Sequence, residues 1–200
     1  MNSDNPYKLK SGNHCRSVIL LLFLGLFFAC AKKIYQKNDY PFYDNTFKLD
    51  TSSALRTDGV YVLDHIWTDE NGGTAKPPKE HRFYKFYKTG QSNLTLDLSH
   101  QIKTKEDYLN AISKDFSIKK NTLFEGYYKL ENNKIVIQSI VVPRQQLEYK
   151  YGYMKKDSLI IVKATSEGKG KFDNIYFTQT YKEFYVFVPL DIKNENDPQW

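Results

Sequence analysis

Aromatic side chains at alternate positions are the residues of this chain best suited to bind a ligand. Tyr149, Tyr151 and Tyr153 alternate with charged or small residues in one short segment. Because the side chains of a β-strand point alternately to its two faces, these three rings are expected to project from one face. Rings that line a barrel pocket could hold an apolar or sugar-like ligand, with the hydroxyl groups orienting it.

The same reasoning extends to Tyr84, Phe86 and Tyr128, which lie in other segments with strand-like patterns. The competing interpretation for all these residues is ordinary packing, with aromatic pairs across neighbouring strands of a half-exposed sheet. Both interpretations stay open, because the sequence does not say which face of each strand is enclosed.

Histidines could bind a metal or act as general bases, but their spacing indicates neither. His65, His81 and His100 belong to no His-x-His or His-Glu-x-x-His pattern. Asp64 adjoins His65, yet neighbours in a regular strand point to opposite faces, so the two are not expected to act together. We predict no metal site.

Patterns typical of a nucleophile or a phosphate-binding loop are also missing. No Cys follows Cys30, which excludes thiol catalysis in the remaining chain, and no Gly-x-Ser-x-Gly occurs. The stretch Gly-Lys-Gly-Lys at 168–171 lacks the spacing and the Ser or Thr of a phosphate-binding loop. We therefore predict no catalytic residue and no cofactor, and we expect a protein that is not an enzyme.

The N-terminal residues have the pattern of an export signal. Lys8, Lys10 and Arg16 precede an unbroken apolar run over residues 18–29. A membrane-spanning helix needs roughly 20 apolar residues, so this run is too short to span and suits a signal-peptide core. The small residue Ala29 directly precedes Cys30.

A basic segment, a short apolar core and a small residue before Cys30 together resemble the lipobox of bacterial lipoproteins. The resemblance implies cleavage before Cys30, a diacylglycerol on its sulfur and acylation of the new amino group. Because each buried CH₂ contributes roughly 0.8 kcal/mol, such chains would hold the protein on a bilayer. The implied location is the bacterial cell envelope, on the outer membrane facing the periplasm. The alternative is an uncleaved signal anchor.

Composition narrows the class of the remaining chain. The 200 residues carry 29 Lys and Arg against 23 Asp and Glu, a formal charge of +6. Removal of residues 1–29 leaves 26 basic and 22 acidic residues, or +4, without a dense basic stripe, so nucleic acid is not an expected partner. An aromatic share of 16% argues against disorder, and two cysteines are too few for a disulfide scaffold.

Strand patterns dominate from residue 59 onward, and one helix interrupts them. Thr104 and Asp107 have the spacing of a capping box, and Leu109, Ile112 and Phe116 share one helical face, which is expected to cover an open end or an edge of the sheet. The predicted strands are residues 59–67, 82–88, 93–98, 124–130, 134–142, 147–153, 158–163, 174–180 and 183–188.

Short strands joined mostly by hairpins predict a mostly β fold, an antiparallel meander that forms a barrel or half-barrel with one helix in mid-chain. A β-sandwich is the alternative. The hairpins around residues 131–133 and 156–157 resemble those of small lipocalin-like lipoprotein domains of Bacteroidetes, best over residues 122–188. That resemblance implies a lipocalin-like barrel.

The predicted organisation has four parts: a signal peptide over residues 1–29, the lipidated Cys30 with a linker over 30–56, the barrel domain over 57–190 and a polar tail over 191–200. The favoured function is a membrane-anchored envelope lipoprotein that binds a small apolar or amphipathic ligand without catalysis. The first alternative is an interaction or accessory subunit of an envelope protein complex that uses an aromatic outer face. The least favoured is an envelope hydrolase, which needs a cleft where Asp, Glu or His converge.

Overall fold

The computed structural model of the chain describes residues 36–117, 125–141, 146–178, 180–192 and 198. The predicted signal peptide and the predicted lipidation site, Cys30, lie outside the described residues, as does most of the polar tail.

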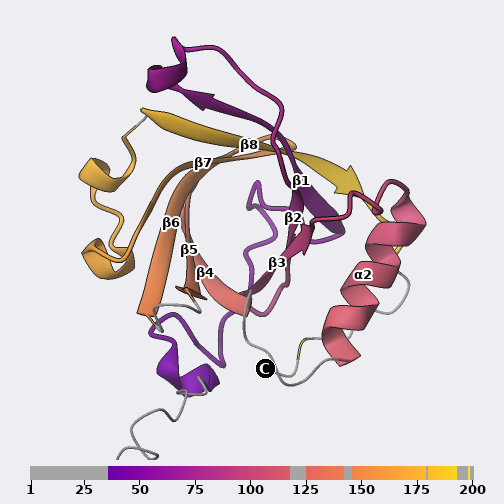
Figure 1. Ribbon diagram of the computed structural model, residues 1–200. Coiled ribbons are helices and arrows are strands. Elements are labelled where there is room, and N and C mark those ends of the chain that lie inside the picture. Colours follow the sequence, from indigo (N-terminus) through magenta and orange to yellow (C-terminus); the bar gives the residue numbers. More distant parts are fainter. Residues whose placement is uncertain (1–35, 118–124, 142–145, 179, 193–197, 199–200) are drawn as a thin grey trace, which may run out of the picture. The chain divides into compact units, whose positions relative to one another are not determined.

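The described strands form one closed antiparallel barrel in which each strand pairs with the next along the chain (Figure 1). The last strand returns to the first, with pairs running from Gly59↔Pro189 to Thr68↔Tyr181. The strands are β1 (Gly59–Thr68), β2 (His81–Phe86), β3 (Gln91–Asp97), β4 (Glu125–Glu131), β5 (Lys134–Val141), β6 (Gln146–Lys155), β7 (Ser158–Thr165) and β8 (Tyr181–Pro189). The mostly β, lipocalin-like meander barrel is thereby confirmed, and the β-sandwich alternative is wrong.

One predicted strand is absent. The described residues of the segment 174–180 do not form a strand, because Asn174–Tyr176 folds as a 3-10 helix, η5, after another short one, η4 (Gly168–Gly170). Gly168 and Gly170 have φ angles of 76°, a left-handed conformation that glycine adopts at low cost and that turns the chain sharply here. The segment folds back and packs its rings on the outside of the barrel.

The described part of the chain holds one α-helix, α2 (Lys105–Ser117), and its start follows the predicted capping box. The Asp107 amide donates to Thr104 Oγ1 at 3.2 Å, and the Thr104 amide donates to the Asp107 carboxylate at 2.8 Å. The apolar face of the helix led to the prediction that it covers an open end or an edge of the sheet, and this prediction is wrong. The helix lies outside the barrel, where Tyr108 packs edge-to-face on Phe83 of β2 at 5.0 Å (Figure 1). The closed barrel has no edge strand for the helix to cover, and the apolar surface beneath the helix lies on the outer faces of β1 and β2.

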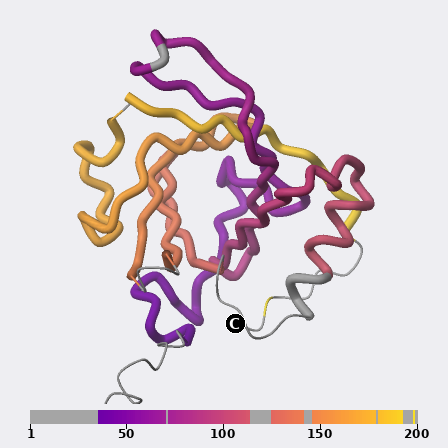
Figure 2. Tube along the Cα trace, viewed as in Figure 1, coloured from indigo at the N-terminus to yellow at the C-terminus, as the bar shows by residue number. Residues whose placement is uncertain are grey.

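Much of the stretch predicted as a linker lies against the barrel. Tyr40, Phe42 and Leu55 are buried, and the Phe42 amide donates to the Gln138 side chain at 3.0 Å. Figure 2 shows the segment, in indigo and violet, running beside and then within the ring of strands. It lacks periodicity because it follows the barrel as an irregular strap, which we define as residues 36–57. Only residues 30–35 then remain between the predicted lipidation site and the strap.

We expect Phe42→Ala to destabilise the protein by about 3 kcal/mol, since the change removes a buried ring. The Phe42 ring packs on the Tyr149 ring, with the centroids 5.7 Å apart, and it lies close against Gly170, where an added Cβ would stand 2.2 Å from it. The neighbours of the ring are therefore in place already and can do little to fill the space that its removal leaves. Urea unfolding measures the free energy. Thr46→Ala is the control, because Thr46 is exposed and its side chain bonds to nearby Asp44. A loss no larger than that of the control would contradict docking of the strap.

Candidate functional site

The interior of the barrel is defined by contacts that cross it. Lys150 of β6 donates to the Tyr84 hydroxyl of β2 at 3.1 Å, although β2 and β6 are not neighbours in the sheet. Phe86 of β2 likewise packs edge-to-face on Tyr128 of β4 at 5.3 Å. The enclosed apolar cluster consists of Tyr61, Leu63, Tyr84, Phe86, Tyr128, Ile135, Ile137, Met154, Leu159, Ile161, Tyr185 and Phe187, with Leu55 from the strap.

The rings of this cluster pack against one another. Tyr61, Phe86, Tyr128 and Tyr185 have no exposed surface, and Tyr84 is 2% exposed. A void that admits water leaves accessible surface on the side chains that line it, so these rings border no such void. Phe47 of the strap adds an edge-to-face contact to Tyr128 at 5.5 Å. This part of the barrel is a filled core.

Toward the other end the interior becomes polar. The Glu183 carboxylate accepts hydrogen bonds from Arg82 at 2.5 Å, from Tyr181 at 2.5 Å and from Tyr185 at 2.6 Å. The Arg82 and Glu183 side chains are 19% and 12% exposed, so the ion pair is largely removed from water. Burial raises the pKa of Tyr185 well above its usual value, which keeps its hydroxyl protonated as a donor.

Lys150 belongs to the same polar end. Burial works against its charge, but the neighbouring Tyr84, Glu148 and Glu183 outweigh that effect and raise the Lys150 pKa above its usual value. Its ammonium lies 3.8 Å from Glu148. Arg82 and Lys150 therefore face two carboxylates, and the charges at this end of the interior balance.

Sequence reasoning missed this polar network. Arg82 and Glu183 are 101 residues apart, so no local motif connects them. One signal was present: Arg82 and Tyr84, like Glu183 and Tyr185, are two positions apart and must share a strand face. The sequence does not show that these two strand faces lie opposite each other inside the barrel.

The structure divides the predicted ligand-lining residues between two places. Tyr84, Phe86 and Tyr128 lie inside the barrel. Tyr149, Tyr151 and Tyr153 share one face, as alternation implies, but that face is the outer one; other parts of the chain bury Tyr149 and Tyr151 and contact Tyr153, which stays partly exposed. The covering contacts are those of Tyr149 with Phe42, of Tyr151 stacked on Tyr176 at 4.9 Å, and of Tyr153 with Phe177 at 5.4 Å. The two sets of residues do not line one pocket.

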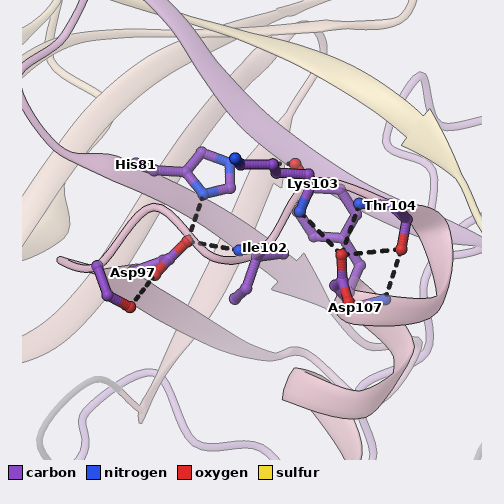
Figure 3. A network of polar contacts seen from close by, with 8 residues as sticks. His81, Asp97, Ile102, Lys103, Thr104 and Asp107 are labelled. Atoms are coloured by element: carbon purple, nitrogen blue, oxygen red, sulfur yellow. Dashed lines mark hydrogen bonds and ion pairs between the residues drawn. The ribbon is translucent and has the colours of Figure 1, made fainter.

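A carboxylate and a histidine converge beside α2, as a hydrolase would need (Figure 3). Asp97 accepts from the Ile102 amide at 2.8 Å and lies 3.1 Å from His81 Nδ1, while His81 Nε2 lies 3.1 Å from the Tyr108 hydroxyl. Burial opposes the charge on Asp97, yet the backbone amides, His81 and Ser99 hold its pKa well below its usual value. Tyr108 is buried, so the network closes on itself and ties α2 to β2 and β3.

Asp64 and His65 are not separated as a regular strand implies. The register of β1 on β8 shifts between Leu63 and His65, and His65 Nδ1 lies 2.6 Å from the Asp64 carboxylate. His65 stacks on Phe184 at 4.2 Å on the outside of the barrel. The described residues contain no group of three or more His, Cys, Asp or Glu side chains placed to hold a metal.

A groove of about 480 Å³ lies on the outer faces of β6, β7 and β8. Alternation puts Tyr153, Ile160 and Phe184 in one row across these strands, since Ile160 pairs with both Tyr153 and Phe184. Lys182 stands beside the row, with its ammonium 4.7 Å from the Trp67 ring. The remaining lining residues are Asn133, Met154, Lys155 and Val162. We define these residues, without Trp67, as the outer groove.

The outer groove adjoins sectors that are already covered. The strap and η5 lie on β4, β5 and β6, and α2 lies on β1 and β2.

No helix in the described part of the chain is long and apolar enough to cross a bilayer. Comparisons of the chain with protein-family models, with curated proteins and with solved structures found no match.

We expect Glu183→Gln to destabilise the protein by about 2 kcal/mol, because it leaves the largely buried Arg82 guanidinium without its nearest counter-charge. Urea unfolding checks this. Glu80→Gln is the matched control: Glu80 lies 3.9 Å from the same guanidinium but its side chain is 54% exposed, so we expect a loss below about 0.5 kcal/mol. Equal losses of unfolding free energy in the two variants would contradict a structural role for the polar network around Glu183.

Asp97 predicts a specific pH dependence. Its folded pKa lies below the unfolded value of about 3.9, so its contribution to stability is complete above about pH 5 and is lost as pH falls through the folded pKa. Asp97→Asn should lower the free energy of unfolding at neutral pH by about 1–3 kcal/mol, since buried donors lose their carboxylate acceptor. The fall of this free energy between pH 5 and 3 should also be less steep than in the wild type. Urea midpoints across that range measure it. Asp173→Asn, at an exposed position, should keep the wild-type slope.

Proposed function

We propose that this protein is a membrane-anchored, non-catalytic lipoprotein of the bacterial envelope, whose barrel is a rigid support that binds another envelope protein through its outer surface. The observation that carries the proposal is a contrast between the two faces of the sheet. Rings fill the inside, where Tyr61, Phe86 and Tyr128 have no exposed surface, while the outside keeps an open groove on β6, β7 and β8.

Docking of the strap supports a role close to the membrane. If Cys30 carries the acyl chains, six residues, 30–35, span the distance from the lipid to the strap. Fully extended, they reach on the order of 20 Å at about 3.3 Å per residue. A barrel held that close to a bilayer meets partners in or on the same membrane, with the outer membrane, on its periplasmic side, as the proposed location.

A second candidate function is favoured by the polar end of the barrel. The side chains of Arg82, Lys150 and Glu148 are 19%, 18% and 28% exposed, whereas the rings deeper inside are sealed. Solvent therefore reaches these charged groups, and a small amphipathic molecule could contact them there. Its polar groups would have to compete with carboxylates that are already in place, which is why we rank this function second.

We expect Cys30→Ser to release the protein from membranes, because the acyl attachment point is lost. Fractionation of cells that express the full chain measures the change, and Cys15→Ser is the matched control because that residue lies ahead of the cleavage site. Continued membrane association of Cys30→Ser would refute the anchor.

Native mass spectrometry of the membrane-purified protein separates the two candidate functions. Our proposal expects the mass of the acylated chain without a bound small molecule. A retained small molecule that is lost on Lys150→Met would replace our proposal with the ligand-binding function.

A further inference from the structure

We infer that the outer groove receives an extended segment of a partner protein in which a few apolar residues lie between two acidic residues. The inference rests on the proposed function and specifies its contact surface.

The floor and walls of the groove are apolar and already ordered. Tyr153 is fixed by its hydroxyl, which donates to the Phe177 carbonyl at 3.1 Å, and Phe184 is backed by the stacked His65 ring at 4.2 Å. Ile160 lies between Tyr153 and Phe184 in the paired strands. Side chains that are fixed before binding lose little conformational entropy on binding, which favours recognition.

Two lysines flank this apolar row on opposite sides. Lys155 stands two positions beyond Tyr153 on β6, and Lys182 stands two positions before Phe184 on β8. Ile160 pairs with both ring residues, and Ser158 pairs with both Lys155 and Val186, which places the two lysines on opposite sides of the row. Strand geometry then separates the lysine Cα atoms by roughly 16 Å, the length of about five extended residues.

The lining residues include two lysines and no Asp or Glu. An occupant with carboxylates at its two ends and apolar side chains between them matches both the charges and the floor. A volume of about 480 Å³ accommodates a few side chains and not a folded domain. The backbone under the apolar row is paired on both sides, since Tyr153 pairs with Lys134 and Ile160, and Phe184 pairs with Ile160 and His65. A partner segment therefore cannot pair with the strand backbone at the row. Side chains in the groove must therefore supply the recognition.

Two other occupants fit less well. If two copies of the chain met groove to groove, Lys155 and Lys182 of one copy would face the same two lysines of the other, and these like charges repel. A bilayer surface is flat, whereas Tyr153, Ile160 and Phe184 are partly buried in a hollow and do not protrude. A narrow protein segment can enter that hollow.

Fluorescence anisotropy with two labelled pentapeptides tests the inference on the full chain held in lipid nanodiscs. One peptide has three leucines between two glutamates, and the other has the same leucines between two lysines. We expect the acidic peptide to bind at least tenfold more tightly. The double variant Lys155→Glu/Lys182→Glu should reverse the preference, while Lys48→Glu, at an exposed residue of the strap, should leave it unchanged.

Equal binding of the two peptides, or a preference that the double variant does not reverse, overturns the inference. Binding to nanodiscs or vesicles rich in phosphatidylglycerol that the double variant abolishes assigns the groove to lipid and also overturns it. So does a concentration-dependent dimer in sedimentation that the double variant dissociates.

A photo-crosslinking amino acid placed in the cell separates failure of this inference from failure of the proposed function. Position Val186 borders the groove and is 45% exposed, and Ile175, on η5, is 64% exposed. Crosslinks to one envelope protein from Val186, lost in the double lysine variant, support the inference. Crosslinks from Ile175 alone overturn the groove and leave the proposed function standing. Crosslinks from neither position count against both.

Discussion

Pairing of β1 with β8 is the constraint on which the rest of this structure depends. The pairing extends from Gly59↔Pro189 to Thr68↔Tyr181 and closes the sheet. The interior of an eight-stranded barrel is just wide enough for side chains to fill it or for one small ligand. In this barrel aromatic and aliphatic side chains, with part of the strap, fill the apolar part of the interior, and the outer face receives α2, η5 and the rest of the strap.

The irregularity in that pairing decides which residues face inward. With perfect alternation from Tyr61 and Leu63, His65 would point into the barrel. The register shift after Leu63 instead turns His65 outward onto Phe184 and brings Ile66 against the inner cluster. A bulge thus keeps an ionisable side chain out of the apolar part of the core, and it also explains why Asp64 and His65 meet.

Local signals made much of the fold predictable. The hairpin with Asn132 and the turn with Lys156 are where sequence patterns put them, and both residues have a positive φ. The capping box of Thr104 and Asp107 marks the helix start correctly. Such features depend on residues a few positions apart, so they survive without knowledge of the tertiary structure.

The orientation of β6 could not be predicted, and the candidate site depended on it. Tyr149 and Tyr151 have the hydrophobic bulk expected of an inner face, while Lys150 between them has the charge expected of an outer one. In the structure Lys150 points inward and bonds to Tyr84 across the barrel, whereas Tyr149 and Tyr151 point outward and are covered by the strap and η5. Both expectations are therefore reversed. Those partners lie far away in sequence, and alternation alone is the same for either orientation.

Charge inside the barrel bears on what the outside can recognise. Arg82 faces Glu183, and Lys150 faces Glu148, so the interior polar end is neutral within itself. The surplus of basic residues in the chain after residue 29 is therefore carried by groups other than this inner network. Lys155 and Lys182 are among them, and they stand at an outer hollow with apolar walls. Because the backbone under the groove is already paired on both sides, this combination of ring surface and lysine side chains is what the groove offers for specific contact.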